Sequence, residues 1–320
     1  MQPGDVTDPE TDLLGTPYTV ETLILRPDSE GAVEANLVHL GSESPSRRAV
    51  LYVHGVCDYF FQTGYAEWWA ARGDDFYALD LRKYGRSLRE HQTPGYVDDL
   101  REYHEELDSA WRLITERDGH DQVVLSAHST GGLILPLWAD ERALPVAGMV
   151  LNSPWVDMHG PFLLRLGANV ARRLGSYQPR RELPRSRNTL YAQALHRSYE
   201  GEWDYDLTLK PAESWPVYAG WLRAIRRGQA SLHRGLDVRG PVLVLTSGAT
   251  GRPTTLSEEL WTTDTVLDVT QMRRWATAVG RHVTVASIEG AIHDVVLSRP
   301  AVRAQVYDEL DRWLSAYGPR

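Results

Sequence analysis

A series of short, continuous apolar runs is the feature that most limits the folds open to this chain. The runs are rich in β-branched and aromatic residues, and they lie at 49–55, 76–81, 122–128, 146–152, 241–248 and 282–290. A strand that is apolar at every position has both faces buried, which is typical of a parallel sheet covered by helices. Two earlier segments, 18–27 and 34–41, alternate instead and are predicted to pair in antiparallel fashion with one more exposed face.

Helical patterns separate these runs. They lie at 97–117, 131–141, 269–280 and 300–317. Strands and helices that alternate along a chain form right-handed crossovers within one open sheet. The predicted fold class is therefore α/β, with a mostly parallel sheet flanked by helices.

The alternation stops between about residues 155 and 235. This stretch is rich in Arg, Trp and Tyr and shows no convincing strand. We interpret residues 155–235 as a helical cap inserted into a core made of residues 1–154 and 236–320. Within the cap, segment 161–177 has apolar residues at helical spacing with arginines nearby. A helix that roofs its own active site is the favoured interpretation, and contact with a membrane surface is the alternative.

Composition excludes several classes of function. The chain has 320 residues, a formal net charge of −9 and no basic block, so no nucleic acid partner is expected. Cys57 is the only cysteine, which excludes an internal disulfide and fits a reducing compartment. Neither a membrane-spanning apolar stretch nor a signal peptide is recognisable, so a cytoplasmic location is predicted. Metal-ligand spacings and a dinucleotide-binding glycine motif are also lacking, so no metal or cofactor is expected.

Reactive residue types follow several of the predicted strands. In an open α/β sheet, ligands and reactive groups collect at the carboxyl ends of the strands. Ser129 follows the run 122–128 within AHSTGG, His293 follows 282–290, and acidic residues lie in the long loop after 241–248. A serine, then a carboxylate, then a histidine, each after its own strand, is the order of the α/β-hydrolase nucleophile site.

These residue types together support nucleophilic catalysis. A serine hydroxyl needs an imidazole to take its proton, and the imidazole needs a carboxylate to orient it. The oxyanion of the intermediate needs backbone N–H donors, which here would be those of Thr130 and Val56. We expect His54 to shape the loop of Val56 by hydrogen bonding, and His128 to pack into the sheet.

Two other residues near the predicted site have both a functional and a structural interpretation. Cys57 lies close to the oxyanion loop, where a buried thiol is favoured over a nucleophilic role. Trp155 comes just past a strand end and is a candidate substrate-binding residue, with ordinary packing as the alternative.

Four segments resemble a known family. HGVCDYF (54–60), LDLRKYGRS (79–87), AHSTGG (127–132) and EGAIHD (289–294) are similar to serine α/β-hydrolases of the monoacylglycerol lipase and lysophospholipase type, which are serine aminopeptidase-like. The resemblance covers most of residues 45–320 and implies the α/β-hydrolase fold with a cap between the sixth and seventh strands. This chain departs from the family pattern at Lys83 and Tyr84, which replace the usual Gly-His, and at Ala127, where Gly is commoner.

The loop after 241–248 is longer than usual in the resembled family, which leaves the catalytic acid open. In that family the acid precedes an apolar pair, and a helix begins four or five residues later. Asp264 meets both conditions and is the first candidate. Asp268, the second candidate, stands where that helix would begin and is a natural N-cap. Glu258 and Glu259 are predicted to lie in a surface turn or short helix.

The sequence therefore predicts a serine hydrolase that cleaves a carboxylic ester through an acyl-enzyme. Ser129 would attack, His293 would act as base and then as acid, and Asp264 would orient it. A small lipid ester such as a monoacylglycerol or lysophospholipid is implied as substrate by the resemblance alone.

Two alternative functions remain open. One is a peptidase or amidase on the same scaffold, in which acidic residues of the cap would hold the amino group of the substrate. The candidate acidic residues are Glu182, Glu200 and Glu202. The other is a non-hydrolytic protein, such as an acyltransferase, cyclase or lyase of secondary metabolism.

Overall fold

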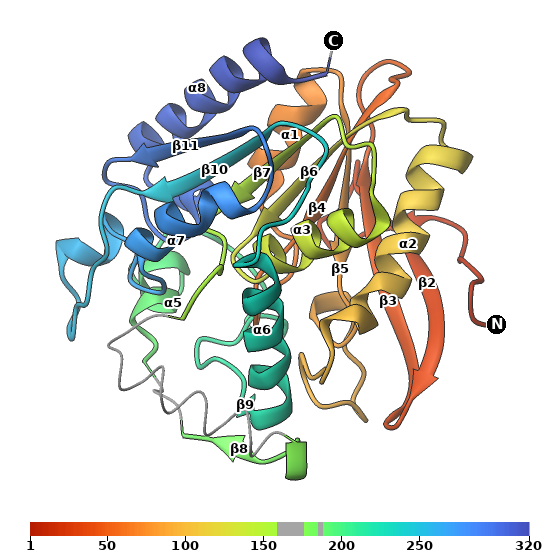
Figure 1. The fold of residues 1–320 in the computed structure, drawn as a ribbon, viewed down its shortest axis with the longest axis horizontal. Helices are drawn as coiled ribbons and strands as arrows, with labels where there is room; N and C mark the ends of the chain where they lie inside the picture. The colour runs from red at the N-terminus through yellow and green to blue at the C-terminus, as the bar shows by residue number, and fades with distance from the viewer. Residues whose placement is uncertain (159–175, 185–187, 320) are drawn as a thin grey trace.

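A nine-stranded sheet forms the centre of the computed structural model, which describes residues 1–158, 176–184 and 188–319 (Figure 1). The strands run in the order β1-β2-β3-β5-β4-β6-β7-β10-β11 across the sheet. They are β1 (Glu10–Thr11), β2 (Thr19–Asp28), β3 (Gly31–Leu40), β4 (Arg48–Val53), β5 (Asp75–Asp80), β6 (Gln122–His128), β7 (Gly148–Asn152), β10 (Val242–Ser247) and β11 (Val283–Ile288). Neighbours from β5 to β11 are parallel, and β2 pairs with β3 in antiparallel fashion. The predicted sheet and its antiparallel pair are confirmed.

Both faces of the central strands are buried, as their continuous apolarity predicts. In β4, Ala49, Leu51 and Val53 contribute to one hydrophobic cluster. Val50 and Tyr52, which point the opposite way, contribute to the other cluster. This alternation is the period of two that strand geometry imposes.

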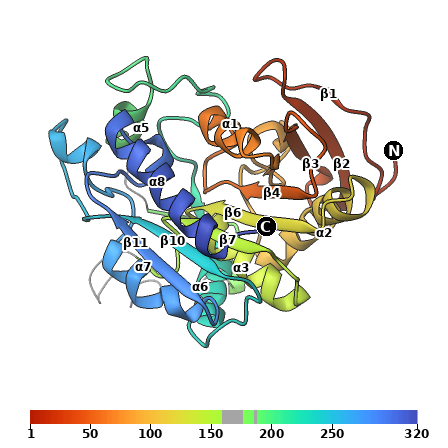
Figure 2. The same cartoon turned by 90° about the horizontal axis from the view of Figure 1, so that it is seen from above.

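Helices cover the two faces of the sheet. They are α1 (Thr63–Ala71), α2 (His104–Arg112), α3 (Gly131–Arg142), α7 (Val269–Trp275) and α8 (Pro300–Tyr317). Figure 2 shows α1 and α8 on one face, with α3 and α7 on the other. The helix predicted over 97–117 is composite, because a 3₁₀ turn (Leu100–Tyr103) precedes α2 and a π turn (Leu113–Arg117) follows it. None of the described helices is long and apolar enough to cross a membrane.

The chain between β7 and β10 leaves the sheet and forms an insertion. Its described elements are β8 (Glu182–Leu183), α5 (Leu190–Leu195), β9 (Val217–Tyr218) and α6 (Ala219–Leu232). The expectation that this stretch holds no strand is wrong, since β8 and β9 pair as a small antiparallel sheet of their own. Two-residue strands are too short to show alternation. Most of the predicted helical segment 161–177 lies outside the described residues.

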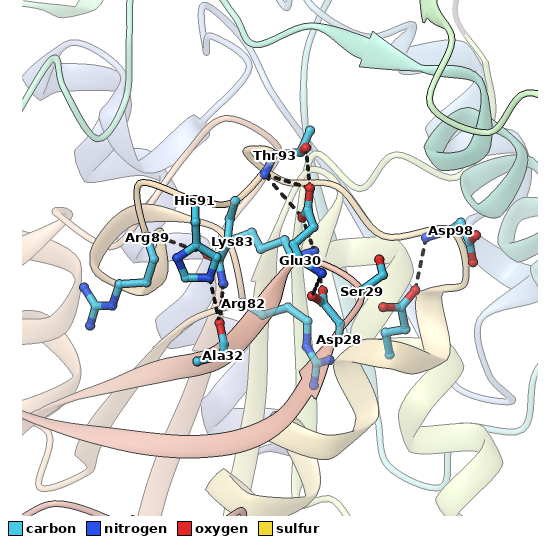
Figure 3. A network of polar contacts seen from close by, with 12 residues as sticks. Asp28, Ser29, Glu30, Ala32, Arg82, Lys83, Arg89, His91, Thr93 and Asp98 are labelled. Carbon is cyan, nitrogen blue, oxygen red and sulfur yellow. Dashed lines mark hydrogen bonds and ion pairs between the residues drawn. The ribbon is translucent and has the colours of Figure 1, made fainter.

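An ion-pair network joins the insertion to the tip of the β2–β3 hairpin. Figure 3 shows its members from the hairpin and from the segment after β5. The ammonium of Lys83, in the segment after β5, lies 2.5 Å from Asp28 and 2.7 Å from Glu30. Arg180 of the insertion contacts the other oxygen of Glu30 at 2.6 Å. Thr93 donates its hydroxyl to that same oxygen at 2.5 Å. Glu30 therefore connects three segments that are distant in sequence.

Candidate active site

Ser129 lies in a sharp turn between β6 and α3. Its φ is +52°, in the left-handed region that costs a non-glycine residue about 1–3 kcal/mol. The backbone N–H of Ser129 donates to the carbonyl of Asn152 at 3.0 Å, and the N–H of Trp155 donates to the carbonyl of Ser129 at 2.9 Å. These two hydrogen bonds hold the strained residue at the end of β6.

Close contacts around this turn exclude a side chain at Gly131 and leave little room for one at Gly55. A Cβ atom at Gly131 would lie 2.6 Å from the carbonyl oxygens of both Val53 and His54. A Cβ atom at Gly55 would lie 3.0 Å from the Cβ of Ser129. The small residues seen in the sequence therefore allow the loop after β4 to lie against the serine.

His293 connects Ser129 with Asp264. Its Nε2 atom lies 3.0 Å from the Ser129 Oγ, and its Nδ1 atom lies 2.8 Å from the Asp264 Oδ2. All three residues are buried. Because a carboxylate can only accept, we assign the proton to Nδ1, which leaves Nε2 free to accept the serine proton. The structure thus brings together the three residues that the sequence nominates as catalytic.

The long loop after β10 returns to the sheet before it presents Asp264. The N–H of Asp264 donates to the carbonyl of Ala249 at 2.9 Å, so residues 251–263 form an excursion that closes on itself. The Asp264 Oδ1 accepts the N–H groups of Val266 and Leu267, each at 2.8 Å. These bonds fix the carboxylate with its other oxygen toward His293.

The other acidic residues of this loop have different roles. Asp268 is the N-cap of α7 and accepts the N–H of Thr270 at 2.9 Å. Glu258 and Glu259 lie in a short 3₁₀ helix (Glu258–Trp261), where Glu258 forms an exposed ion pair with Arg299. The structure therefore places the first candidate acid, and not the second, against His293.

The predicted oxyanion donors come from two loops, since Thr130 directly follows Ser129 and Val56 lies in the loop after β4. Val56 and Thr130 both border Ser129, and neither backbone N–H donates to another described residue. His54 accepts the N–H of Leu81 at Nε2 (3.0 Å), and its Nδ1 lies 2.7 Å from the carbonyl of Gly55. Burial lowers the pKa of His54, so the ring is neutral and braces this loop, as predicted.

His128 lies behind Ser129 among buried carboxylates. Its Nδ1 atom lies 3.4 Å from Asp58 and 3.9 Å from Asp294, and its ring centroid is 4.9 Å from that of His293. The expectation that His128 packs into the sheet did not include these carboxylates. Only the position of Asp294, directly after His293 in the chain, could have indicated one of them.

The insertion contributes Tyr191, which the sequence analysis did not identify. The Tyr191 hydroxyl accepts the N–H of Asp294 at 3.1 Å, and its ring lies edge-on to His293 with centroids 6.0 Å apart. Tyr191 belongs to the six-residue helix α5, which is too short to carry a clear periodic pattern. No sequence signal could have found this contact.

Two cavities meet at Val56 and Ser214. The first, which we call the reaction cavity, has a volume of about 220 Å³ and is lined by Ser129 and His293. The second, which we call the aromatic cavity, has a volume of about 270 Å³ and has an apolar, aromatic lining. Its aromatic residues are Tyr84, Tyr96, Trp155, Trp215, Tyr218 and Trp221. Trp155 is therefore placed where a bound group could contact it.

Cys57 borders the reaction cavity without the features of a nucleophile. Its side chain is buried, and burial raises the pKa of the thiol. The reactive form of cysteine is the thiolate, so a raised pKa disfavours reaction. This agrees with the structural interpretation of Cys57.

Comparison with known families agrees with this arrangement. The family profile described as serine aminopeptidase, S33, matches residues 44–300. The chain belongs to this family. This match confirms the predicted family. The similar solved structures confirm the predicted α/β-hydrolase fold. The comparison with curated proteins finds no match.

Solved structures of similar fold include three esterases and lipases. A soluble variant of monoglyceride lipase from Saccharomyces cerevisiae is 14% identical, with a TM-score of 0.68, over 93% of this S33 chain and 95% of that chain. The monoacylglycerol lipase of Paleococcus ferrophilus is 19% identical, with a TM-score of 0.65, over 88% of this chain and 98% of the lipase. A thermostable carboxyl esterase from Bacillus coagulans is 14% identical, with a TM-score of 0.66, over 93% of this chain and 98% of the esterase. At these identities the likeness shows the fold.

Proposed function

We propose that the protein is a serine hydrolase that cleaves carboxylic esters through an acyl-enzyme. The observation that carries the proposal is the continuous relay from the Ser129 Oγ through His293 to Asp264, with contacts of 3.0 and 2.8 Å. His293 takes the proton as Ser129 attacks and returns it to the departing alcohol. Asp264 keeps the imidazole in one tautomer and stabilises the imidazolium that forms.

The negative charge of the tetrahedral intermediate would be held by the N–H groups of Val56 and Thr130. A single donor of this kind contributes roughly 3–4 kcal/mol to the transition state. The close contact of Gly55 with Ser129 supports this role, because it keeps the Val56 loop beside the nucleophile. No metal or cofactor takes part in the proposed reaction.

The two cavities support an orientation for the ester. The departing oxygen must come within hydrogen-bond reach of the His293 Nε2, so the alcohol part belongs in the reaction cavity. The acyl part then extends past Val56 into the aromatic cavity, where Trp155, Trp215 and Trp221 offer a large apolar area. We therefore propose an ester with an apolar acyl group, such as a small lipid ester, as the substrate class.

The family description raises a peptidase as the alternative. An aminopeptidase needs a carboxylate that is free to hold the amino group of its substrate. Asp58 is the one carboxylate among the described residues that line the two cavities, and it is already paired with Lys210 at 2.5 Å. Three other acidic residues proposed from the sequence line neither cavity. They are Glu182, Glu200 and Glu202. Ester cleavage is therefore the better supported function.

A matched pair of substrates tests this proposal. p-Nitrophenyl butyrate and butyryl-p-nitroanilide carry the same acyl group on an ester and an amide. We expect release of butyric acid from the ester at a rate at least 100-fold above that from the anilide, and loss of both activities in Ser129→Ala. Preference for the anilide would favour the amidase alternative, and transfer of the butyryl group to an added alcohol without acid release would favour an acyltransferase.

A further inference from the structure

Asn152, the last residue of β7, lies between the strands that carry the nucleophile and the base. The order β6-β7-β10-β11 in the sheet separates Ser129, which follows β6, from His293, which follows β11. Asn152 itself pairs with His128 of β6 on one side and with Leu245 of β10 on the other. Its backbone is therefore fixed on both sides within the sheet.

Hydrogen bonds connect Asn152 with both catalytic loops. Its carbonyl oxygen accepts the backbone N–H of Ser129 at 3.0 Å. Its side-chain Nδ2 donates to the Oδ1 of Asp294 at 2.6 Å, and its Oδ1 accepts the N–H of Val295 at 3.1 Å. Asp294 and Val295 directly follow His293 in the chain. One residue thus holds the nucleophile by its main chain and the neighbours of the base by its side chain.

The partners of Asn152 leave one orientation for its amide group. A backbone N–H can only donate and a carboxylate can only accept, so the amide oxygen faces Val295 and the amide nitrogen faces Asp294. The other oxygen of Asp294 accepts an N–H of the Gln62 side chain at 3.1 Å. The Oε1 of Gln62 in turn accepts the N–H of Phe61 at 3.0 Å. Both amide groups therefore have one orientation that satisfies their hydrogen bonds.

Burial makes this arrangement specific. Asn152 is 6% exposed, and Asp294 and Gln62 are each 1% exposed. In such surroundings an unpaired polar group is costly, so a fully satisfied network favours one packing over others. Apolar side chains of similar size would fill the same space but would not fix the distance between the two loops. The network therefore resists a shift of the base relative to the nucleophile.

We propose that Asn152, together with Asp294, is a positioning residue that keeps His293 within hydrogen-bond distance of Ser129. The contact between the Ser129 Oγ and the His293 Nε2 is 3.0 Å, and proton transfer requires such a distance. This inference rests on the proposed hydrolase chemistry and deepens it. Asn152 and Asp294 line neither the reaction cavity nor the aromatic cavity, so they act through the nucleophile and the base.

The rate of labelling by a fluorophosphonate probe measures the proposed role. The probe reacts with a serine whose imidazole base is in place, and its use requires no knowledge of the substrate. Asn152→Ala removes the side-chain hydrogen bonds and adds no charge. Because a misplacement of about 1 Å can cost a factor of about 100 in rate, we expect folded Asn152→Ala to be labelled roughly 10–100-fold more slowly than the unaltered protein.

Asn36→Ala is the matched control. Asn36 of β3 is 5% exposed, and its side chain accepts from Thr22 at 2.9 Å and donates to Ser87 at 3.2 Å. It therefore resembles Asn152 in burial and bonding, but β5 and β4 separate its strand from β6. Asn36→Ala should lower the melting temperature and leave the labelling rate of the folded protein unchanged.

Exchange of the two side chains tests whether the hydrogen bonds themselves matter. Asn152→Asp alone places two carboxylates against each other and should slow labelling at least as much as Asn152→Ala. When it is combined with Asp294→Asn, the carboxylate at position 152 can accept from Val295 and from the new amide, whose oxygen can accept from Gln62. The double variant should recover most of the labelling rate. If the pair only stabilised the fold, both single variants at position 152 would be labelled at the unaltered rate once folded.

The outcomes separate this inference from the function on which it rests. An unchanged labelling rate in folded Asn152→Ala would overturn the positioning role, and so would an exchanged pair that is labelled as slowly as Asn152→Asp. Labelling of Ser129 in the unaltered protein would stand in both cases, and with it the proposed hydrolase chemistry. Absence of labelling in the unaltered protein would instead overturn that chemistry itself.

Discussion

The carboxylate of Asp264 faces His293 through one oxygen only. Its Oδ2 lies 2.8 Å from the His293 Nδ1, while its Oδ1 accepts two backbone N–H groups of its own loop. The loop therefore fixes the direction of the carboxylate, and the carboxylate fixes the tautomer of the histidine. This relationship separates the role of Asp264 from that of Asp268, four residues further along the chain.

Substitution of Asp264 should mainly lower activity, whereas substitution of Asp268 should mainly lower stability. Asp264→Asn should lower kcat by about 10⁴-fold, because the amide leaves His293 in the wrong tautomer. Asp268→Ala should retain most of the activity and cost about 1 kcal/mol of stability, because it removes the N-cap of α7. Ester turnover and melting temperature should be measured for both variants side by side. A reversed pattern would assign the catalytic acid to Asp268.

Gly131→Ala should disturb the turn that presents Ser129. The added Cβ would lie 2.6 Å from two backbone carbonyl oxygens, so the backbone around the turn would have to shift. We expect a loss of about 1–3 kcal/mol in the free energy of unfolding, together with reduced ester turnover. Gly64→Ala in α1 is the control, since its Cβ would meet nothing closer than 4.0 Å. Chemical denaturation of the two variants measures the difference, and equal effects would show that the turn is not tightly packed.

Trp215 should limit the length of the acyl group. It lines the aromatic cavity and packs on Tyr84 with ring centroids 5.3 Å apart, so Trp215→Ala enlarges the cavity. We expect the preferred p-nitrophenyl ester to shift to a longer acyl chain. Trp203→Phe should leave the preference in place, because Trp203 lines neither cavity and donates to the carbonyl of Leu297 instead. An unchanged chain-length profile in Trp215→Ala would argue against an acyl group in this cavity.

The network around Glu30 predicts a dependence of stability on pH. Partial burial opposes ionisation of Glu30, but hydrogen bonds from Lys83, Thr93 and Arg180 outweigh it and lower its pKa to about 2. A carboxyl with a lowered pKa stabilises the fold above its unfolded pKa of about 4.3, and this contribution is lost as the pH falls toward 2. Glu30→Gln should therefore be less stable at pH 7 and lose less on acidification. Melting temperatures of both proteins between pH 7 and pH 3 provide the test, and parallel curves would contradict it.

The sheet and the ends of its strands could be predicted because their signals are local. Continuous apolarity marks each parallel strand, and Ser129 and His293 come directly after such runs. The choice of Asp264 as the catalytic acid depended on the family resemblance as well, because its loop makes a long excursion before it returns to Ala249.

The residues that the insertion contributes could not be predicted in the same way. Tyr191 and Lys210 reach the site from a short helix and a loop, and each contacts a residue about a hundred or more positions away in the chain. Such contacts depend on tertiary packing, which leaves no periodic pattern in the sequence. Of the aromatic residues that line the aromatic cavity, the sequence singled out Trp155 but not Trp215 and Trp221 of the insertion.

Labelling with a fluorophosphonate probe, followed by peptide mass spectrometry, tests the central claim most directly. Such probes form a covalent bond with a serine that an adjacent imidazole activates. We predict one adduct, on Ser129, in the unaltered protein, no adduct in folded Ser129→Ala, and much slower labelling in His293→Ala. Absence of labelling in the folded, unaltered protein, or an adduct on another residue that persists in Ser129→Ala, would contradict the assignment of Ser129 as the nucleophile.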